Sequence, residues 1–538
     1  MFSKITFSWQ QMLLTMLVAF TLGLSSCKDD DPTPDDTNNN PTNPDGKDTT
    51  APTAKLTTSA TSEVVWNTVT LTIEATDDVA IDKIELKIDG TSVKTATTSP
   101  FDFAWDTQKF TEGQHTITVT GTDKAGNTKS VELKATVQNV LLKTTVASDF
   151  LGIEERAERG FIFLSDKDGK TIVAQEFKNG DAIELRASTF NENIFTATQV
   201  IYNSDGYASI TTFVNVARGN WVLTPSGAID NDIPSVGQAS LTFSNADPNI
   251  VYSLYTNNDY TEFVKDNVDA NLSLLSNPGI LYVEEREGTH YGFFNNVKVG
   301  TNSPIDLSKV SKTLTEETLH TPDGFGSTQI RIFGLHTATT KNRDYIPLRG
   351  PEFTDEYTLT YPANEFPAYY SETTLEGNNI FAYIDVKKVY DLTPLKATVN
   401  VSLTGNKYTG SVTGDADFVF YYLTGGESNF DWAFVGPAGD QSILIPEVPE
   451  IVAAVIDPIE MEDTSTGITV VDLLDLTGGY NALLQSVRAS TYGFSDLFKD
   501  FVTETKELQI DEIPGSNNSG SRKSNGREAH RRFTDTWR

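Results

Sequence analysis

Residues 69–75 (VTLTIEA) decide the fold of the first structured part of the chain, because apolar and polar side chains alternate at every position. The same alternation returns in residues 84–88 (IELKI), 101–105 (FDFAW), 117–119 (ITV) and 131–137 (VELKATV). A period of two places the apolar side chains on one face of each segment, which is typical of half-buried β-strands. The sequence therefore predicts a β-structure for this region.

Turn signals separate these segments at short and regular spacing. Asp89-Gly90 is typical of a tight hairpin, and residues 125–127 (AGN) form a second turn signal. Edge strands are expected near residues 54–56 and 91–96. Together these strands predict a two-sheet β-sandwich over residues 52–138.

Three motifs in this region follow one another in a defined order: residues 100–107 (PFDFAWDT), 113–115 (GQH) and 122–127 (TDKAGN). They resemble the bacterial Ig-like domain of secreted and cell-surface proteins. The resemblance covers residues 52–138 and implies a module that spaces, presents or binds, with neither a cysteine pair nor catalytic residues. His115 shares the strand face of Ile117 and Val119, so we expect it to pack at the edge of the core.

Two loops of this sandwich carry oxygen ligands. Asp77 and Asp78 follow the second strand, while Asp123 and Asn127 flank a late turn, and both loops are expected at one end of the sandwich. Carboxylate and amide oxygens are ligands that Ca²⁺ prefers. The alternative is turn chemistry, in which Asp and Asn side chains bond their own backbone.

The N-terminus reads as a secretory leader. Residues 12–24 (MLLTMLVAFTLGL) form an apolar run of 13 residues, which is too short to span a bilayer. This run ends in residues 24–27 (LSSC), which resemble a bacterial lipobox. The resemblance implies that a signal peptide, residues 1–26, is removed and that Cys27 carries lipid such as palmitate. Cys27 is the only cysteine of the chain, so an intramolecular disulfide is excluded.

The residues after Cys27 predict where the protein is displayed. Residues 28–31 (KDDD) resemble the signal that exports Bacteroidota lipoproteins to the outer face of the outer membrane. Residues 27–51 are rich in Pro, Asp, Asn and Thr, which predicts a disordered stalk. The expected location is therefore the outer membrane, with a lipid anchor and exposure at the cell surface.

The rest of the chain is strand-like for most of its length. We expect one β-domain at residues 140–245 and one or two more at 246–460. Residues 461–514 are expected to be partly helical and to pack on the second β region, with helix-like apolar runs at 470–474 and 480–487. Residues 515–538 predict a disordered basic tail. The expected fold class is all-β and multi-domain: an Ig-like sandwich followed by further sandwich-type domains, with a short helical C-terminal segment.

Composition limits the possible partners. The 538 residues contain 41 basic and 74 acidic side chains, a formal net charge of −33. Nucleic acid is not an expected partner, because binding to its phosphates needs basic surfaces. The expected partners are the membrane, through the lipid at Cys27, and a glycan or protein ligand.

Motifs for catalysis do not stand out. The sequence contains neither a Gly-rich phosphate loop nor a GxSxG elbow, and we assign no catalytic residue. Aromatic rings that could stack on sugars are Tyr421, Tyr422 and Trp432, with Trp432 the strongest candidate for an exposed ring; core packing is the alternative. The sequence thus predicts a surface protein for binding, adhesion or scaffolding. A carbohydrate-active enzyme of the glycoside hydrolase type remains the alternative. Such an enzyme needs two carboxylates on either side of a cleft, and this pair has no fixed sequence motif by which it could be recognised among the 74 acidic residues.

Overall fold

The computed structural model describes residues 47–148, 150–151, 159–221, 223, 235–257, 260–263, 269–337, 345–348, 350–425, 430–456, 464–489 and 504–514. Strands dominate these residues, which confirms the all-β, multi-domain expectation. The α-helices among them are α1 (Glu450–Ala453) and α2 (Gly479–Ala489). Neither of these helices has the length and apolar character needed to cross a membrane.

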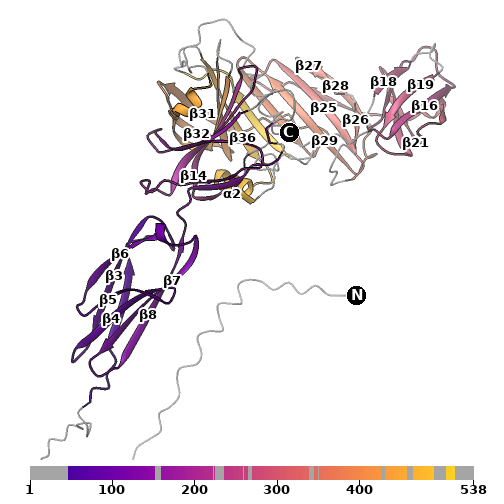
Figure 1. Ribbon diagram of the computed structural model, residues 1–538. Coiled ribbons are helices and arrows are strands. Elements are labelled where there is room, and N and C mark those ends of the chain that lie inside the picture. Colours follow the sequence, from indigo (N-terminus) through magenta and orange to yellow (C-terminus); the bar gives the residue numbers. More distant parts are fainter. Residues whose placement is uncertain are drawn as a thin grey trace, which may run out of the picture.

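The N-terminal module (residues 53–137) is a sandwich of two mostly antiparallel sheets and lies at one end of the molecule in Figure 1. One sheet has the order β1-β3-β6 and the other β2-β8-β7-β4-β5. The strands are β1 (Thr53–Thr58), β2 (Val64–Val65), β3 (Thr68–Thr76), β4 (Ile81–Ile88), β5 (Thr91–Ala96), β6 (Phe101–Asp106), β7 (Gly113–Asp123) and β8 (Thr128–Val137).

The alternation seen in the sequence fills the interior of this module. Leu71, Ile73, Ile84 and Ile117 are completely buried, whereas the polar residues between them face outward. Trp105 at the end of β6 lies in the same core. The period-two prediction is therefore confirmed here, and burial of these side chains stabilises the sandwich by roughly 1.5–3 kcal/mol each.

The central body is built from two separate stretches of the chain that share one hydrophobic core. The first stretch supplies β9 (Leu142–Thr145), β10 (Arg159–Ser165), β11 (Thr171–Phe177), β12 (Ala182–Leu185), β13 (Ile194–Tyr202), β14 (Ala208–Ala217) and β15 (Gly219–Asn220). The second supplies β30 (Ile380–Val386), β31 (Ala397–Thr404), β32 (Lys407–Gly414), β33 (Phe418–Gly425), β34 (Phe430–Pro437), β35 (Gly439–Leu444), β36 (Thr464–Leu473) and β37 (Thr505–Ile510).

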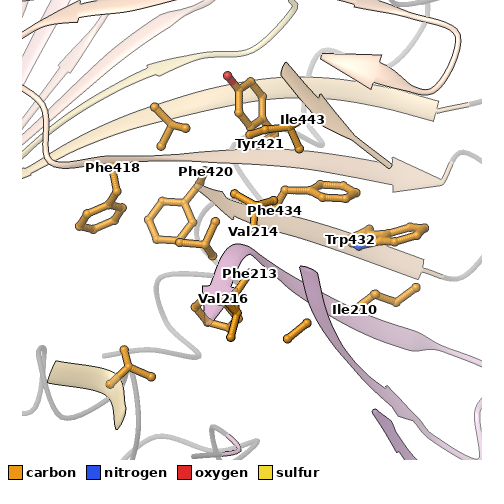
Figure 2. Close-up of a cluster of buried hydrophobic side chains, with 14 of the residues drawn as sticks. Ile210, Phe213, Val214, Val216, Phe418, Phe420, Tyr421, Trp432, Phe434 and Ile443 are labelled. Atoms are coloured by element: carbon orange, nitrogen blue, oxygen red, sulfur yellow. The ribbon is translucent and has the colours of Figure 1, made fainter. Parts of the chain in front are cut away.

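A parallel pairing of β14 with β34 joins these two stretches. The pairing runs from Ala208 opposite Phe430 to Phe213 opposite Val435. Figure 2 shows the apolar side chains gathered around this seam. Because the paired residues are more than two hundred positions apart in the chain, the central body forms only when both stretches are folded.

An insert between β15 and β30 extends the molecule away from the N-terminal module, as Figure 1 shows. Its strands are β16 (Gly237–Ser244), β17 (Tyr252–Tyr255), β18 (Tyr260–Phe263), β19 (Asp269–Leu274), β20 (Gly279–Glu285), β21 (His290–Val297), β22 (Asn302–Asp306), β23 (Lys312–Thr313), β24 (Thr315–His320), β25 (Ser327–Leu335), β26 (Tyr345–Leu348), β27 (Glu352–Phe353), β28 (Glu356–Tyr361) and β29 (Ala368–Glu376).

The insert is not an independent unit, because β29 and β25 continue the largest sheet of the central body. That sheet has 13 strands in the order β11-β10-β13-β14-β34-β33-β36-β37-β30-β29-β25-β26, with β27 paired to β25. This sheet contains strands from residues 140–245, 246–460 and 461–514, which were expected to form separate parts of the chain. The domain boundaries drawn from the sequence stay predictions.

One helical expectation is wrong and another is confirmed. Residues 470–473 belong to β36 rather than to a helix, because β36 lies between β33 and β37 and is buried on both faces. A strand covered on both sides is apolar throughout and loses the alternation that identifies it. Residues 480–487 do lie in α2, whose Tyr480 O–H donates to the carbonyls of Val214 (2.7 Å) and Val435 (2.9 Å).

Candidate functional site

Three carboxylates from separate segments meet at one end of the N-terminal module. Asp48 lies before β1, Asp77 follows β3, and Asp123 is the last residue of β7. One carboxylate oxygen from each residue lies within 4.8 Å of the other two. Since β3 and β7 belong to opposite sheets, this carboxylate cluster connects both layers of the sandwich to the chain segment that enters it.

Two of the four residues predicted as calcium ligands take part in this cluster, namely Asp77 and Asp123. Asp78 is exposed, and its Oδ2 accepts a hydrogen bond from the Thr50 hydroxyl (3.3 Å). Asn127 donates its main-chain N–H to Asp123 Oδ1 (2.8 Å) and its side-chain Nδ2 to Asp123 Oδ2 (2.7 Å). Asn127 thus orients Asp123 through these two hydrogen bonds.

Asp48 was not among the predicted ligands, because this residue lies in a low-complexity segment rich in aspartate. Its Oδ1 accepts the N–H of Thr50 (2.8 Å), and the carbonyls of Asp48 and Thr50 both accept Asn127 Nδ2 at 3.1 Å. These contacts hold the end of the predicted stalk against the module. The only signal in the sequence was the closeness of Asp48 to the first strand.

Asp123 is the most buried member of the carboxylate cluster, with 2% of its surface exposed. Burial raises the pKa of Asp123, but hydrogen bonds from Asn127 and from the main-chain N–H groups of Gly126 and Ala125 lower it more. The resulting pKa lies below the usual value of an aspartate. Asp123 is therefore ionised at neutral pH.

The predicted exposed ring at Trp432 is wrong, because only 1% of this residue is accessible. Trp432 stacks on Phe434 with ring centroids 5.0 Å apart, and its Nε1 donates to the Thr212 hydroxyl (2.8 Å). The reason is that β34 is covered on both faces, so apolar and polar side chains do not alternate along it. Without this alternation, the aspartate before Trp432 wrongly indicated a surface loop.

The neighbouring tyrosines are core residues as well. Tyr421 is 0% and Tyr422 8% exposed, and their hydroxyls donate to Gln441 Oε1 and Asp511 Oδ1, both at 2.8 Å. Burial raises the pKa of both hydroxyls above the usual value of a tyrosine. In this conformation none of the three predicted aromatic residues offers a face on which a sugar ring can stack.

A buried arginine joins the N-terminal module to the central body. Arg218 is 4% exposed, and its guanidinium lies 4.6 Å from the centre of the Trp66 ring in the module. It donates to the carbonyls of Asn139 (3.3 Å), Phe190 (2.9 Å) and Glu192 (3.1 Å). Burial lowers the pKa of Arg218 to about 10, so it stays charged at neutral pH.

Further hydrogen bonds surround this arginine at the same joint. Trp66 Nε1 donates to the Asn191 carbonyl (2.8 Å), and Asn67 Nδ2 donates to Asn191 Oδ1 (2.8 Å). Asn139 Oδ1 accepts from the Asn67 N–H (3.1 Å) and from the Thr107 hydroxyl (2.8 Å). Such a satisfied polar network fixes the orientation of two packed units.

His115 packs inside the N-terminal module, as its strand face predicted, with 5% of its surface exposed. Its ring meets Trp105 and Phe110 edge-on. Nδ1 lies 2.5 Å from Asp89 Oδ2 and Nε2 lies 2.8 Å from the Thr111 carbonyl oxygen. His115 is thus a packing residue with both ring nitrogens bonded.

This pair makes the stability of the module depend on pH. Burial lowers the pKa of His115, but the bonds to Thr111 and Asp89 raise it to a net value above the usual one. A raised folded-state pKa adds stability that is complete below about pH 6.5 and is lost as pH rises through the folded-state pKa. The pKa of Asp89 is lowered, chiefly by its bond to His115, so its contribution is lost on acidification below about pH 4.

We therefore expect the melting temperature of the module to fall between pH 6 and pH 8, and His115→Gln to remove most of this fall. Thermal unfolding across that range measures it. His320→Gln is the control, because His320 lies in the insert and is 68% exposed beside Glu356. An unchanged pH dependence in His115→Gln would contradict the prediction.

The acidic run at residues 284–287 has two different environments. Glu284 is buried and accepts the hydroxyls of Tyr282 (2.8 Å) and Tyr255 (3.3 Å). Glu285 is the last residue of β20, and its Oε2 accepts the main-chain N–H of His290 (3.2 Å) and lies 3.0 Å from His290 Nδ1. Successive residues of this strand face opposite ways, so these two acids do not form a facing pair.

Other predicted features lie outside the described residues. They are the signal peptide at residues 1–26, Cys27, the motif at residues 28–31, residues 27–46 of the stalk and the basic tail at 515–538.

The comparisons with known proteins identify the N-terminal module. Residues 52–119 match the family described as a bacterial Ig domain. This match supports the predicted Ig-like resemblance for the module, which the two-sheet sandwich also fits. No curated protein matches the chain.

Several solved structures share limited similarity with the chain. Fibronectin(III)-like modules of Clostridium thermocellum CbhA are 25% identical, with 16% of this chain and 96% of that chain covered and a TM-score of 0.14. The SGBP-B of a Bacteroides ovatus mixed-linkage glucan utilization locus, in complex with a mixed-linkage heptasaccharide, is 14% identical (56% and 87% covered, TM-score 0.13). A tetra-tandem repeat in the extending region of a large adhesion protein is 12% identical (64% and 100% covered, TM-score 0.15). TM-scores this low carry no weight for the function.

Proposed function

We propose that this chain is a lipid-anchored protein of the outer cell surface with a binding, adhesion or scaffolding role. In this proposal Cys27 carries the lipid, residues 28–51 lead away from the membrane, and the Ig-like N-terminal module is a spacer. The central body and its insert then present a surface to a glycan or protein ligand.

The observation that carries the proposal is the joint at Arg218. Its guanidinium is enclosed between Trp66 of the module and the carbonyls of the central body. A spacer can hold a ligand-binding region at a fixed distance and angle only when the joint between them is stiff. A buried arginine at the joint contributes to this stiffness, because moving the module would break the contact of the guanidinium with the Trp66 ring and its bond to the Asn139 carbonyl and would leave buried charge with fewer partners.

The surface location is tested by treating intact cells with proteinase. Removal of the protein from intact cells is expected, with a periplasmic protein as the protected control. Full protection of the chain would contradict surface display. A Cys27→Ser variant should leave the membrane fraction, because one cysteine supplies the only lipid site of the proposal.

The binding role is tested with the chain from residue 28 onward on a glycan array, beside an assay for released reducing sugar. Binding without release is expected for a presenter. Release of sugar would support the alternative of a carbohydrate-active enzyme, and binding to neither glycan nor protein extracts would favour a purely structural role.

A further inference from the structure

Two carboxylate oxygens in the cluster of Asp48, Asp77 and Asp123 have no hydrogen-bond partner among the residues that the structure describes. Asp48 Oδ2 and Asp77 Oδ1 are shielded from solvent and make no hydrogen bond. Their sister oxygens are bonded: Asp48 Oδ1 accepts the Thr50 N–H, and Asp77 Oδ2 accepts the N–H groups of Val79 and Ala80, both at 3.0 Å. Leaving a buried acceptor unbonded costs about 1–3 kcal/mol, and more for a charged group.

Within the described part of the chain, the negative charge of this cluster is also not balanced by a basic side chain. No lysine, arginine or histidine among the described residues forms a salt bridge within 4.0 Å with Asp48, Asp77 or Asp123. Three carboxylates at this separation repel one another, and Asp123 is buried with 2% of its surface exposed. A cation placed among them would remove both the repulsion and the unbonded oxygens.

We propose that Asp48, Asp77 and Asp123 bind a Ca²⁺ ion that fastens the segment before β1 to the end of the N-terminal module. Ca²⁺–oxygen distances of about 2.3–2.6 Å place two ligands of one ion at most about 5 Å apart. The separation of 4.8 Å or less between the three oxygens satisfies this condition.

The donor set favours Ca²⁺ over other common metals. All three ligands are carboxylates, which are hard oxygen ligands. Hard oxygen ligands from flexible loops suit Ca²⁺, which accepts six to eight of them in irregular geometry. Zinc and copper prefer nitrogen or sulfur ligands, and the cluster contains neither.

The ion would cross-link three parts of the chain. Asp48 belongs to the incoming segment, Asp77 follows a strand of one sheet, and Asp123 ends a strand of the other. Calcium binding would therefore both order residues 47–52 and stabilise the sandwich. The spacer would gain stiffness at its membrane-facing end wherever Ca²⁺ is abundant, as it is outside cells.

The test is calcium titration of the chain from residue 28 onward, after removal of divalent ions with EDTA. Isothermal titration calorimetry is expected to show one site with a dissociation constant of about 10⁻⁴–10⁻³ M, as in extracellular calcium modules. Saturation should raise the melting temperature of the module by roughly 4–8 °C or more. It should also slow proteolytic cleavage within residues 47–52.

Three variants make the test specific. Asp123→Asn and Asp48→Asn are each expected to weaken calcium binding at least tenfold. Asp48 lies outside the sandwich strands, so the Asp48→Asn variant remains informative if the Asp123→Asn variant fails to fold. Asp78→Asn is the matched control: Asp78 neighbours the site but is bonded to Thr50, so its variant should keep wild-type affinity.

Two outcomes would overturn the proposal. One is the absence of any calcium-dependent heat or melting shift up to 10 mM CaCl₂. The other is weak binding at many sites that Asp48→Asn leaves unchanged, which would reflect only the net charge of −33.

Discussion

Replacing Trp432 by alanine should lower the free energy of unfolding of the central body by about 3–5 kcal/mol. The indole is fully buried, stacks on Phe434 and donates to the Thr212 hydroxyl on β14. Its removal leaves a cavity beside the parallel seam of β14 and β34, the contact that joins the two halves of the body (Figure 2). Urea unfolding followed by tyrosine and tryptophan fluorescence measures the loss.

The matched control for this prediction is Trp432→Phe, which keeps an aromatic ring and loses the bond to Thr212. We expect it to cost clearly less than Trp432→Ala, because most of the core volume is retained. A small loss of stability in Trp432→Ala, combined with loss of glycan binding, would contradict the core assignment. That pattern would restore the sequence-based interpretation of Trp432 as a stacking ring.

Replacing Arg218 by methionine should cost about 2–4 kcal/mol and loosen the joint between the N-terminal module and the central body. The methionine keeps part of the buried volume but cannot donate to the carbonyls of Asn139, Phe190 and Glu192. Small-angle scattering should show a wider spread of particle dimensions than in the wild type. Limited proteolysis should show faster cleavage near residue 139, where the module ends.

Arg159→Met is the control, because Arg159 forms an exposed pair with Glu176 in which both side chains are 42% accessible. Such a pair contributes about 1 kcal/mol or less. Arg218→Lys should behave more like Arg218→Met than like the wild type, since an ammonium lacks the planar fork that reaches several carbonyls. Scattering profiles that coincide for the wild type and Arg218→Met would contradict the role of the joint in the proposed spacer.

The sequence was most informative where strands are covered on one face only. In the N-terminal module the period of two placed Leu71, Ile73 and Ile84 in the core, as the structure confirms. In the central body, strands such as β33, β34 and β36 are buried on both faces, so the alternation disappears. This is why residues 470–473 resembled a helix and Trp432 resembled a surface residue.

The carboxylate cluster was predictable in part. Asp77 and Asp123 follow strands whose ends could be placed from the alternation and the turn signals. Asp48 could not be found in this way, because its position depends on hydrogen bonds between a segment without regular structure and Asn127. The same holds for Arg218, whose partners come from the module, from the linker at Asn139 and from the loop at residues 190–192.

The sequence by itself determined the all-β class, the sandwich at residues 52–138 and the inward face of each of its strands, because these follow from the spacing of neighbouring side chains. Only the tertiary structure decided that β14 pairs with β34, that Trp432 is core, and that Asp48 meets Asp77 and Asp123. These features join residues far apart in the chain. Local alternation carries information about which face of a strand is buried and none about which distant strand or loop covers that face.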